Sequence, residues 1–166
     1  FARGVITYVT RRGVAYNDAT INWAIGQMND GNTIAENTTL LEGRNAVSYP
    51  RTVTIGRGDQ IQNFTTTTHH VGNDTDGQIL QRGVMLEKTT AIFNAVGKIE
   101  DGASGSNAEQ ESRILMLSGD ARGDANPILL IDENDVTAGH APYVGRIDES
   151  QIYYLQIHGI SKEEAE

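Results

Sequence analysis

Short extended segments, separated by glycine, asparagine and aspartate, run through most of this chain of 166 residues. Between Ala2 and Pro127 there is no amphipathic helical run of useful length, so helices are not expected to supply the core there. Threonine and isoleucine are frequent, and β-branched residues favour strands. Val53 and Ile55 alternate around Thr54, as in a half-buried strand. The chain is therefore predicted to be all-β, with strands at residues 5–10, 20–24, 33–41, 52–55, 60–64, 79–80, 84–86, 91–96, 113–117 and 128–131.

The turn residues help to choose between a sandwich, a barrel and a solenoid. A sandwich of hairpins needs many two-residue Asn-Gly or Asp-Gly turns, but only three such pairs occur, at residues 30–31, 76–77 and 101–102. The four threonines at residues 65–68 and the scattered asparagines suit parallel coils in which like residues stack. No strict repeat is present, and the pattern modestly favours a β-solenoid over a sandwich.

Several classes of protein are disfavoured by what the chain lacks. Thirteen Lys and Arg residues stand against 22 Asp and Glu residues, a net charge of −9, so no nucleic acid partner is expected. In residues 132–166 eight acidic residues stand against two basic ones, so this end carries −6 of the total. No apolar run approaches the about 20 residues of a membrane span. Cysteine is absent, which excludes disulfides and any thiolate-ligated metal site made by this chain alone.

The C-terminal end also changes in secondary structure. Residues 148–151 (Asp-Glu-Ser-Gln) predict a capped helix start, and Gly159 predicts the stop. A second capping box at residues 161–164 announces another helix just before the chain ends. We therefore expect a β-helix core over residues 1–147 and the truncated beginning of a helical domain over residues 148–166. Together with a start that is not Met, this predicts a piece cut from a longer protein.

The four histidines are candidate ligands or acid–base groups. His69 and His70 are adjacent, and adjacent strand residues face opposite sides, so the pair does not readily share one metal ion. His158 stands at the predicted end of the helix, where the helix dipole favours a cation. His140 lies in a small, apolar stretch at residues 136–145. A hydrogen-bonded packing role and a role as ligand or proton acceptor both stay open for it.

A longer stretch around His140 resembles a known family. Residues 125–141 read Ala-Asn-Pro-Ile-Leu-Leu-Ile-Asp-Glu-Asn-Asp-Val-Thr-Ala-Gly-His-Ala. This run is similar to the C-terminal signature of the SufB/SufD family of iron–sulfur cluster assembly scaffolds. The likeness covers nearly the whole chain and is highly specific from about Arg113 onward. Further matches lie at residues 113–118, 123–127, 144–148, 151–155 and 159–165, with looser ones at 59–60, 63, 66, 70, 83–84, 93–94 and 97–99.

The resemblance implies a fold and a function. The fold is a right-handed parallel β-helix (a solenoid) followed by a small helical domain. Family members are not enzymes, so the implied role is a non-catalytic, cytoplasmic scaffold that acts with a SufB-like scaffold and a SufC-like ATPase. An iron–sulfur cluster is implied only transiently, in the full complex, and none is expected on the isolated fragment. A homodimer formed through exposed strand edges also stays open, and no membrane partner is implied.

Two features of the sequence point to the SufD-like branch of the family. SufB-like chains carry a cysteine in the strand that matches residues 113–117, and a glutamate directly after the signature histidine. This chain has no cysteine, and Ala141 follows His140. In the SufD-like branch the matching histidine is implicated in cluster assembly at the interface with SufB. The resemblance thus makes His140 the candidate site residue, a possible contributor to a metal site that this chain does not complete; no catalytic residue is implied.

One departure and two alternatives accompany this interpretation. The run Ala-Pro-Tyr at residues 141–143 replaces smaller residues in the family pattern, so we expect an altered loop there. The alternative functions are a secreted β-helix enzyme that acts on polysaccharides and a sugar-binding β module. The enzyme would need clustered acids or calcium ligands, and usually aromatic platforms. The chain has three Phe, six Tyr and one Trp and no acidic cluster of that kind, which disfavours it.

Overall fold

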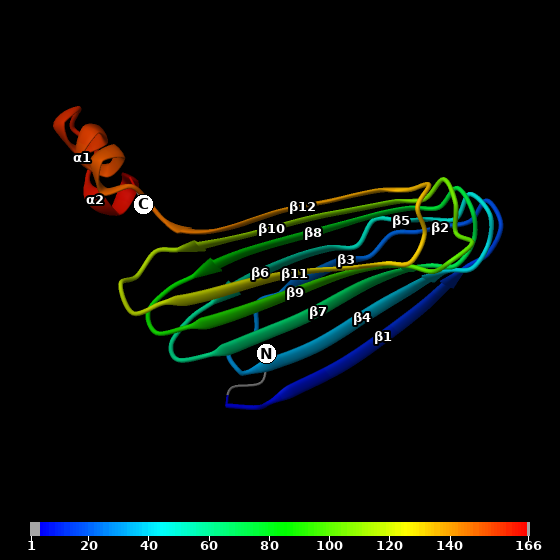
Figure 1. Cartoon of the computed structure of the whole chain (residues 1–166). Coiled ribbons are helices and arrows are strands. Elements are labelled where there is room, and N and C mark those ends of the chain that lie inside the picture. The colour runs from blue at the N-terminus through cyan, green and yellow to red at the C-terminus, as the bar shows by residue number, and fades with distance from the viewer. Residues whose placement is uncertain (1–3, 166) are drawn as a thin grey trace.

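Two sheets of parallel strands face each other in the computed structural model, which describes residues 4–165 (Figure 1). The chain passes from one sheet to the other and back, and five such turns form the predicted β-solenoid. The first sheet is ordered β1 (Thr7–Ala15), β4 (Thr33–Leu41), β7 (Ile61–His70), β9 (Thr90–Ile99) and β11 (Arg122–Ile131). The second sheet contains β12 (Thr137–Arg146), β10 (Asn107–Met116), β8 (Asp76–Met85), β6 (Arg51–Gly56), β5 (Val47–Ser48), β3 (Ala24–Gln27) and β2 (Thr20–Ile21).

Successive turns stack like residues on one another, as the threonine and asparagine pattern predicts. Thr38 lies in register with Thr67, and Thr39 with Thr68. On the outer face of the first sheet, Asn126 Nδ2 donates to Asn94 Oδ1 of the preceding turn at 3.0 Å. Register partners are roughly 30 residues apart. This spacing is the structural repeat, one turn of the solenoid. The residues at equivalent positions differ from turn to turn, so the repeat is not visible in the sequence.

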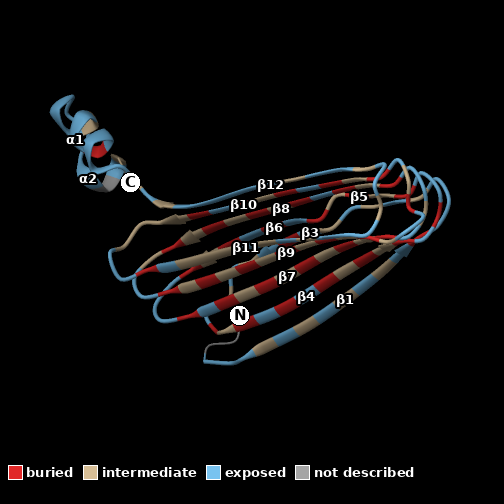
Figure 2. Cartoon of the chain, viewed as in Figure 1, coloured by how far each residue is buried: buried red, intermediate tan, exposed pale blue. Residues whose placement is uncertain are grey.

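The solenoid interior combines an apolar core with many polar side chains. Along the central strands, buried and partly exposed residues alternate, so one face of each strand points inward (Figure 2). Phe64 and Phe93, on adjacent turns, meet edge-to-face with ring centroids 5.8 Å apart. Such a pair contributes about 0.5–1.5 kcal/mol beyond the burial of its area. Met85 and Ile114 belong to the same cluster and close it from the second sheet.

The alternation predicted at residues 53–55 is present but inverted. Thr54 is fully buried, whereas Val53 is 45% exposed. The Thr54 hydroxyl donates to the carbonyl of Gln27 on the preceding turn at 3.1 Å, which satisfies it inside the solenoid. β6 is in register with β8, where Thr54 pairs with the inward-facing Gly83. The neighbouring strand, and not side-chain hydropathy, therefore decides which face of β6 is inside.

Most strands are longer in the structure than in the sequence-based prediction, but the strand predicted at residues 20–24 is broken after Ile21. The strand at residues 33–41 has its predicted bounds, whereas the segments at 79–80 and 84–86 are joined into one strand, β8. β12 is not predicted at all, and the altered loop expected at residues 141–143 was wrong, because this run lies inside β12. Proline and glycine lower strand propensity, but a strand with one free edge tolerates proline. Pro142 lies on such an edge strand.

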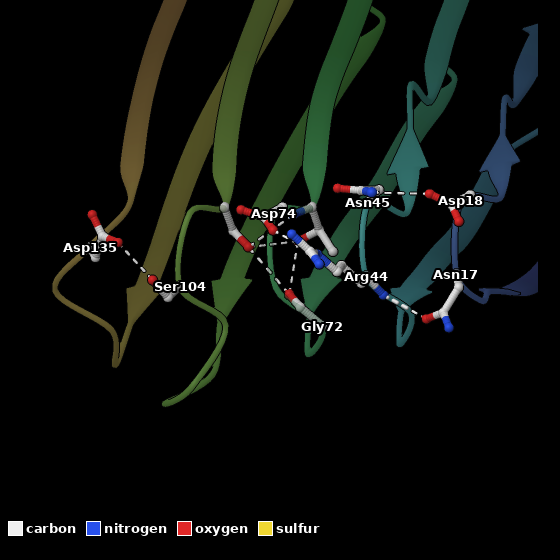
Figure 3. A network of polar contacts seen from close by, with 10 residues as sticks. Asn17, Asp18, Arg44, Asn45, Gly72, Asp74, Ser104 and Asp135 are labelled. Atoms are coloured by element: carbon white, nitrogen blue, oxygen red, sulfur yellow. Dashed lines mark hydrogen bonds and ion pairs between the residues drawn. The ribbon is translucent and has the colours of Figure 1, made fainter.

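One corner of the solenoid is held by asparagine, aspartate and arginine side chains (Figure 3). Asp18, Asn45 and Asp74 have φ angles of 57°, 55° and 56°, in the left-handed region that Asn and Asp tolerate better than other non-glycine residues. Between turns, Asn45 Nδ2 donates to Asp18 Oδ1 and Arg44 Nε donates to Asp74 Oδ2, each at 3.0 Å. Figure 3 shows similar contacts on later turns. The Asn and Asp punctuation of the sequence thus forms stacked corners, not hairpins.

Two helices, α1 (Glu149–Ile157) and α2 (Lys162–Ala165), follow β12 and lie beyond the end of the stacked strands (Figure 1). The described part of the chain has no helix before α1. As predicted, Asp148 is the N-cap of α1, and its Oδ1 accepts a hydrogen bond from the backbone N–H of Ser150 at 2.9 Å. Over residues 4–165, no helix is long and apolar enough to cross a membrane.

The predicted helix stop and the second helix start are also confirmed. Gly159 has φ of 89°, which favours glycine, and its N–H donates to a carbonyl of the last turn of α1. The Ser161 backbone N–H donates to Glu164 Oε2 at 3.2 Å, and Ser161 Oγ accepts from the Glu164 N–H at 3.3 Å. This reciprocal pair is a capping box. Of α1, only Ile152 is buried.

Candidate functional site at the open end of the solenoid

The last turn of the solenoid is uncovered. β11 and β12 are the edge strands of the two sheets at this end. On β12 the inward-facing residues His140 and Val144 are exposed, whereas their register partners on β10, Gln110 and Ile114, are buried (Figure 2). A sheet edge presents unpaired backbone N–H and C=O groups, which can accept a further strand. This end of the molecule therefore offers both an interior face and two free strand edges.

His140, the candidate predicted from the sequence, lies in the middle of β12. Its register partner is the inward-facing Gln110. Parallel strands in register direct partner side chains to the same face, so the His140 ring belongs to the inner face of the open turn. The ring is exposed, and among the described residues it makes no hydrogen bond or ion pair. A neutral imidazole placed in this way is available as a ligand or a proton acceptor.

Gln110 is the functional candidate that the sequence analysis missed. It is only 4% exposed. Its Nε2 donates to the backbone carbonyl of Ile128 on β11 at 2.9 Å. Its Oε1 is buried and has no hydrogen-bond partner among the described residues. The one signal in the sequence is the spacing of 30 residues from His140, which becomes informative only when the length of a solenoid turn is known.

The other three histidines have structural surroundings, in agreement with the sequence analysis. His69 and His70 face opposite sides of β7: His69 Nε2 contacts Glu100 Oε1 at 2.7 Å, while the buried His70 places Nδ1 2.8 Å from the Thr75 hydroxyl. His158 caps the end of α1, with Nδ1 2.8 Å from the carbonyl oxygen of Tyr154. Each of these three rings thus has a partner close to it in the fold.

Burial lowers the pKa of His70 to about 4. The Asp76 carboxylate raises this pKa and the neighbouring His69 lowers it, but loss of water around the ring is the largest cause. On the outer face, Glu100 has a lowered pKa because Lys98 and then His69 donate hydrogen bonds to it. These groups stabilise the strands around β7 and do not reach the open end at β12.

The helices, which lie past the carboxyl end of β12, leave a second uncovered surface. Tyr153, Tyr154 and Ile157 on α1 are each at least 60% exposed. A hollow of about 450 Å³ separates α1 from the last turn of the solenoid, and Met116 and Arg146 are among its lining residues. Large apolar side chains gathered on one exposed element are typical of a surface that meets another protein.

The fold and the site define a parallel β-solenoid protein whose open last turn presents one histidine and no thiolate. The family model described as "SUF system FeS cluster assembly, SufBD core domain" matches residues 1–166, and the chain belongs to this family. It is 61% identical over 164 residues to the iron-sulfur cluster assembly protein SufD of Bacillus subtilis (strain 168). That similarity covers 98% of this chain and 38% of the Bacillus protein.

More distant relatives show the same partial coverage. The iron-sulfur cluster assembly protein SufB of the same Bacillus strain is 23% identical over 165 residues, which are 99% of this chain and 36% of that protein. An iron-sulfur cluster assembly SufBD family protein of Mycobacterium tuberculosis (strain H37Rv) is 26% identical over 165 residues, covering 99% of this chain and 20% of the relative. The chain therefore spans well under half the length of these relatives.

The family resemblance inferred from the residues is confirmed. The chain is much more similar to the Bacillus SufD than to the Bacillus SufB, at 61% against 23% identity, which confirms the SufD-like branch. The comparisons lend no support to a polysaccharide-active enzyme or a sugar-binding module. The relatives are named as assembly proteins, which is consistent with a scaffold role.

Proposed function

We propose that this chain is part of a non-catalytic scaffold subunit that builds iron–sulfur clusters in the SUF system, in the cytoplasm, together with a SufB-type scaffold and a SufC-type ATPase. The cluster is the cargo of the complex and not a resident cofactor of this chain. Membership of the SufBD core family and the high identity to a SufD protein support this proposal. The boundary between a β-helix core and a helical domain, near residue 147, belongs to the same proposal.

His140 is the residue on which the proposal depends most. The observation that carries it is an exposed imidazole on the inner face of the edge strand β12, in a chain without cysteine. Iron–sulfur clusters are held mainly by thiolates, so this chain would supply one nitrogen ligand or proton acceptor. The partner would supply the thiolates. The free edges of β11 and β12 are where a SufB-type scaffold would add its own strands.

The exposed surface of α1 is a suitable docking surface for the third component, the SufC-type ATPase. Tyr153, Tyr154 and Ile157 would be covered once the helical domain is complete and the ATPase is bound. Because this chain spans 38% of the length of the Bacillus SufD, we expect it to bind the ATPase weakly by itself. For the same reason, and because it has no thiolate, it is expected to hold no cluster alone.

The direct test is cluster assembly by the full-length protein with His140→Ala. In a reconstitution with the SufB-type scaffold, the SufC-type ATPase, iron and a sulfur donor, we expect cluster yield to fall about 10-fold or more. Bound iron and acid-labile sulfide measure the yield. The thermal unfolding midpoint is expected to change little, because the ring is exposed and does not belong to the packed interior.

His69→Ala is the matched control, because its ring lies on the outer face of β7, where it contacts Glu100, away from the open turn. It is expected to assemble clusters at the wild-type level. Wild-type yield with His140→Ala, or an equal loss with the control, would contradict the assignment of His140.

A further inference from the structure

We propose that Gln110 is a positioning residue: its amide oxygen accepts a hydrogen bond from the His140 ring and so leaves one defined ring nitrogen free to act in cluster assembly. The part of this inference that concerns the free nitrogen rests on the proposed function. The contact between the two side chains does not, and it can be tested separately.

The two residues occupy one row of the solenoid. Gln110 on β10 is in register with His140 on β12 and with Ile79 on β8. Side chains in such a row share a face and are one strand spacing apart, about 4.8 Å. Gln110 is 4% exposed and His140 is exposed. The buried amide therefore lies directly beside the imidazole, on the inner side.

The orientation of the Gln110 amide is fixed by the opposite sheet. Its nitrogen lies 2.9 Å from the carbonyl oxygen of Ile128, and a carbonyl oxygen can only accept. The amide nitrogen must therefore face Ile128, and the oxygen is the end left over. Gly97 makes room for this arrangement, because a Cβ there would lie 2.9 Å from Gln110 Nε2. The oxygen is buried and has no partner among the described residues, although buried polar atoms are normally paired.

On the second sheet, among the inward side chains of this row and of the two rows beside it, His140 is the donor that has no partner among the described residues. Ile79, Ala108 and Pro142 have no side-chain donor. The Ser112 hydroxyl donates to Gln81 Oε1 at 2.9 Å. The Gln81 amide nitrogen in turn donates to the Thr66 hydroxyl at 3.2 Å. In the proposed contact, the exposed His140 ring turns one N–H toward the Gln110 oxygen.

Such a bond would determine which nitrogen of His140 is available. A neutral imidazole has one N–H donor and one acceptor nitrogen. If the N–H is held by Gln110, the other nitrogen carries the lone pair and faces the open end, where a partner would complete the site. Histidines that bind metals usually donate their second nitrogen to an oxygen in this way, which fixes the tautomer and the orientation of the ring.

The experiment compares two Gln110 variants in the full chain, labelled with ¹⁵N-histidine. Gln110→Leu removes both ends of the amide, whereas Gln110→Glu keeps an acceptor for His140 and loses only the donor to Ile128. The readout is the tautomer of His140 from its ring ¹⁵N shifts at alkaline pH. Gln81→Leu is the matched control, since Gln81 is equally buried but has its own partners.

In the wild-type chain and in Gln81→Leu we expect one dominant His140 tautomer. In Gln110→Leu the ratio of tautomers should fall at least 5-fold, towards that of a free imidazole. In Gln110→Glu the N–H facing residue 110 should persist. An unchanged ratio in Gln110→Leu would overturn the inference. Equal changes in the Leu and Glu variants would also overturn it, because both lose the bond to Ile128 and a purely structural role predicts that they behave alike.

Cluster assembly by the full-length protein separates this inference from the proposed function. Gln110→Leu is expected to lower cluster yield about 10-fold, and Gln110→Glu to restore it in large part. If the tautomer of His140 shifts in Gln110→Leu while cluster yield stays at the wild-type level, the contact is upheld and the proposed role of His140 fails.

Discussion

His70 lies in an interior row between Leu41 and Ile99, both fully buried. Its Nδ1 contacts the Thr75 hydroxyl, but Nε2 is buried without a hydrogen-bond partner among the described residues. A histidine in such a place is held neutral, and its pKa is lowered to about 4 from an ordinary value of 6.5. The ring thus contributes packing to the interior at neutral pH, and its protonation opposes folding.

Stability is expected to fall as the pH drops below 6.5, because the unfolded chain then binds a proton at residue 70 that the folded chain does not bind. The loss ends near pH 4, where the folded chain is protonated as well. Between pH 7 and pH 5 this one group should lower the free energy of unfolding by about 2 kcal/mol. Urea unfolding at the two pH values measures it.

His70→Leu should remove this part of the pH dependence, because leucine does not titrate and is apolar like its row neighbours Leu41 and Ile99. Ile99→Val is the control from the same row: it should cost about 0.5–1.5 kcal/mol equally at both pH values. If His70→Leu keeps the wild-type loss between pH 7 and pH 5, another group must be responsible and the account of His70 is wrong.

At the scale of elements, the positions of proline and glycine show what the sequence can and cannot predict. Pro127 and Pro142 lie on the edge strands β11 and β12, and Pro50 lies in the break between β5 and β6. In the local sequence, proline therefore predicts that these segments are not strands. The fold nevertheless accepts proline there, because both strands lie at a sheet edge. Whether a strand is an edge depends on the whole stack. For this reason β12 and its inward row, including Gln110 beside His140, could not be predicted.

Structural signals that are contained within a few residues are predicted correctly from the sequence. The caps at Asp148, Gly159 and Ser161 depend on local backbone groups, and all three are present. Which face of β6 is buried depends on the neighbouring strands. The alternation alone predicts Val53 inside, whereas Thr54 is inside in the structure. His140 itself was identified from a signature and not from its surroundings, because its position at the open end is a property of the stack.

Close backbone approach between turns gives a prediction at the stacked corner. A Cβ on Gly43 would lie 1.9 Å from the backbone nitrogen of Asn17 and 2.1 Å from the backbone carbon of Tyr16. Backbone atoms of the preceding turn cannot move aside as a flexible side chain can. Gly43→Ala should therefore lower the free energy of unfolding by about 2–3 kcal/mol, measured by urea unfolding.

Gly26→Ala is the matched control, because a Cβ on Gly26, in β3, meets no atom within 4 Å. Its stability should stay within ~1 kcal/mol of wild type, with any change favourable, since alanine has less conformational freedom to lose. A Gly43→Ala variant as stable as this control would show that the turns are not stacked as closely as described.

For the molecule as a whole, the two ends of the described structure differ in character. The body of stacked strands is nearly neutral, while residues 132–166 carry −6 of the net charge of −9. This acidic end contains the edge strand β12, His140 and the exposed surface of α1. Free strand edges, a histidine without thiolates, and exposed aromatic side chains therefore occur together. We propose that all three features meet partners in cluster assembly.

The most direct test of this account places a photoreactive amino acid at position 140 of the full-length protein, in the presence of the SufB-type scaffold. A cross-link to that scaffold is predicted from position 140. No cross-link is predicted from position 67, which lies on the outer face of the first sheet. Mass spectrometry identifies the linked partner. A cross-link from position 67 with none from position 140 would contradict the central claim that the open end bearing His140 is completed by a partner scaffold.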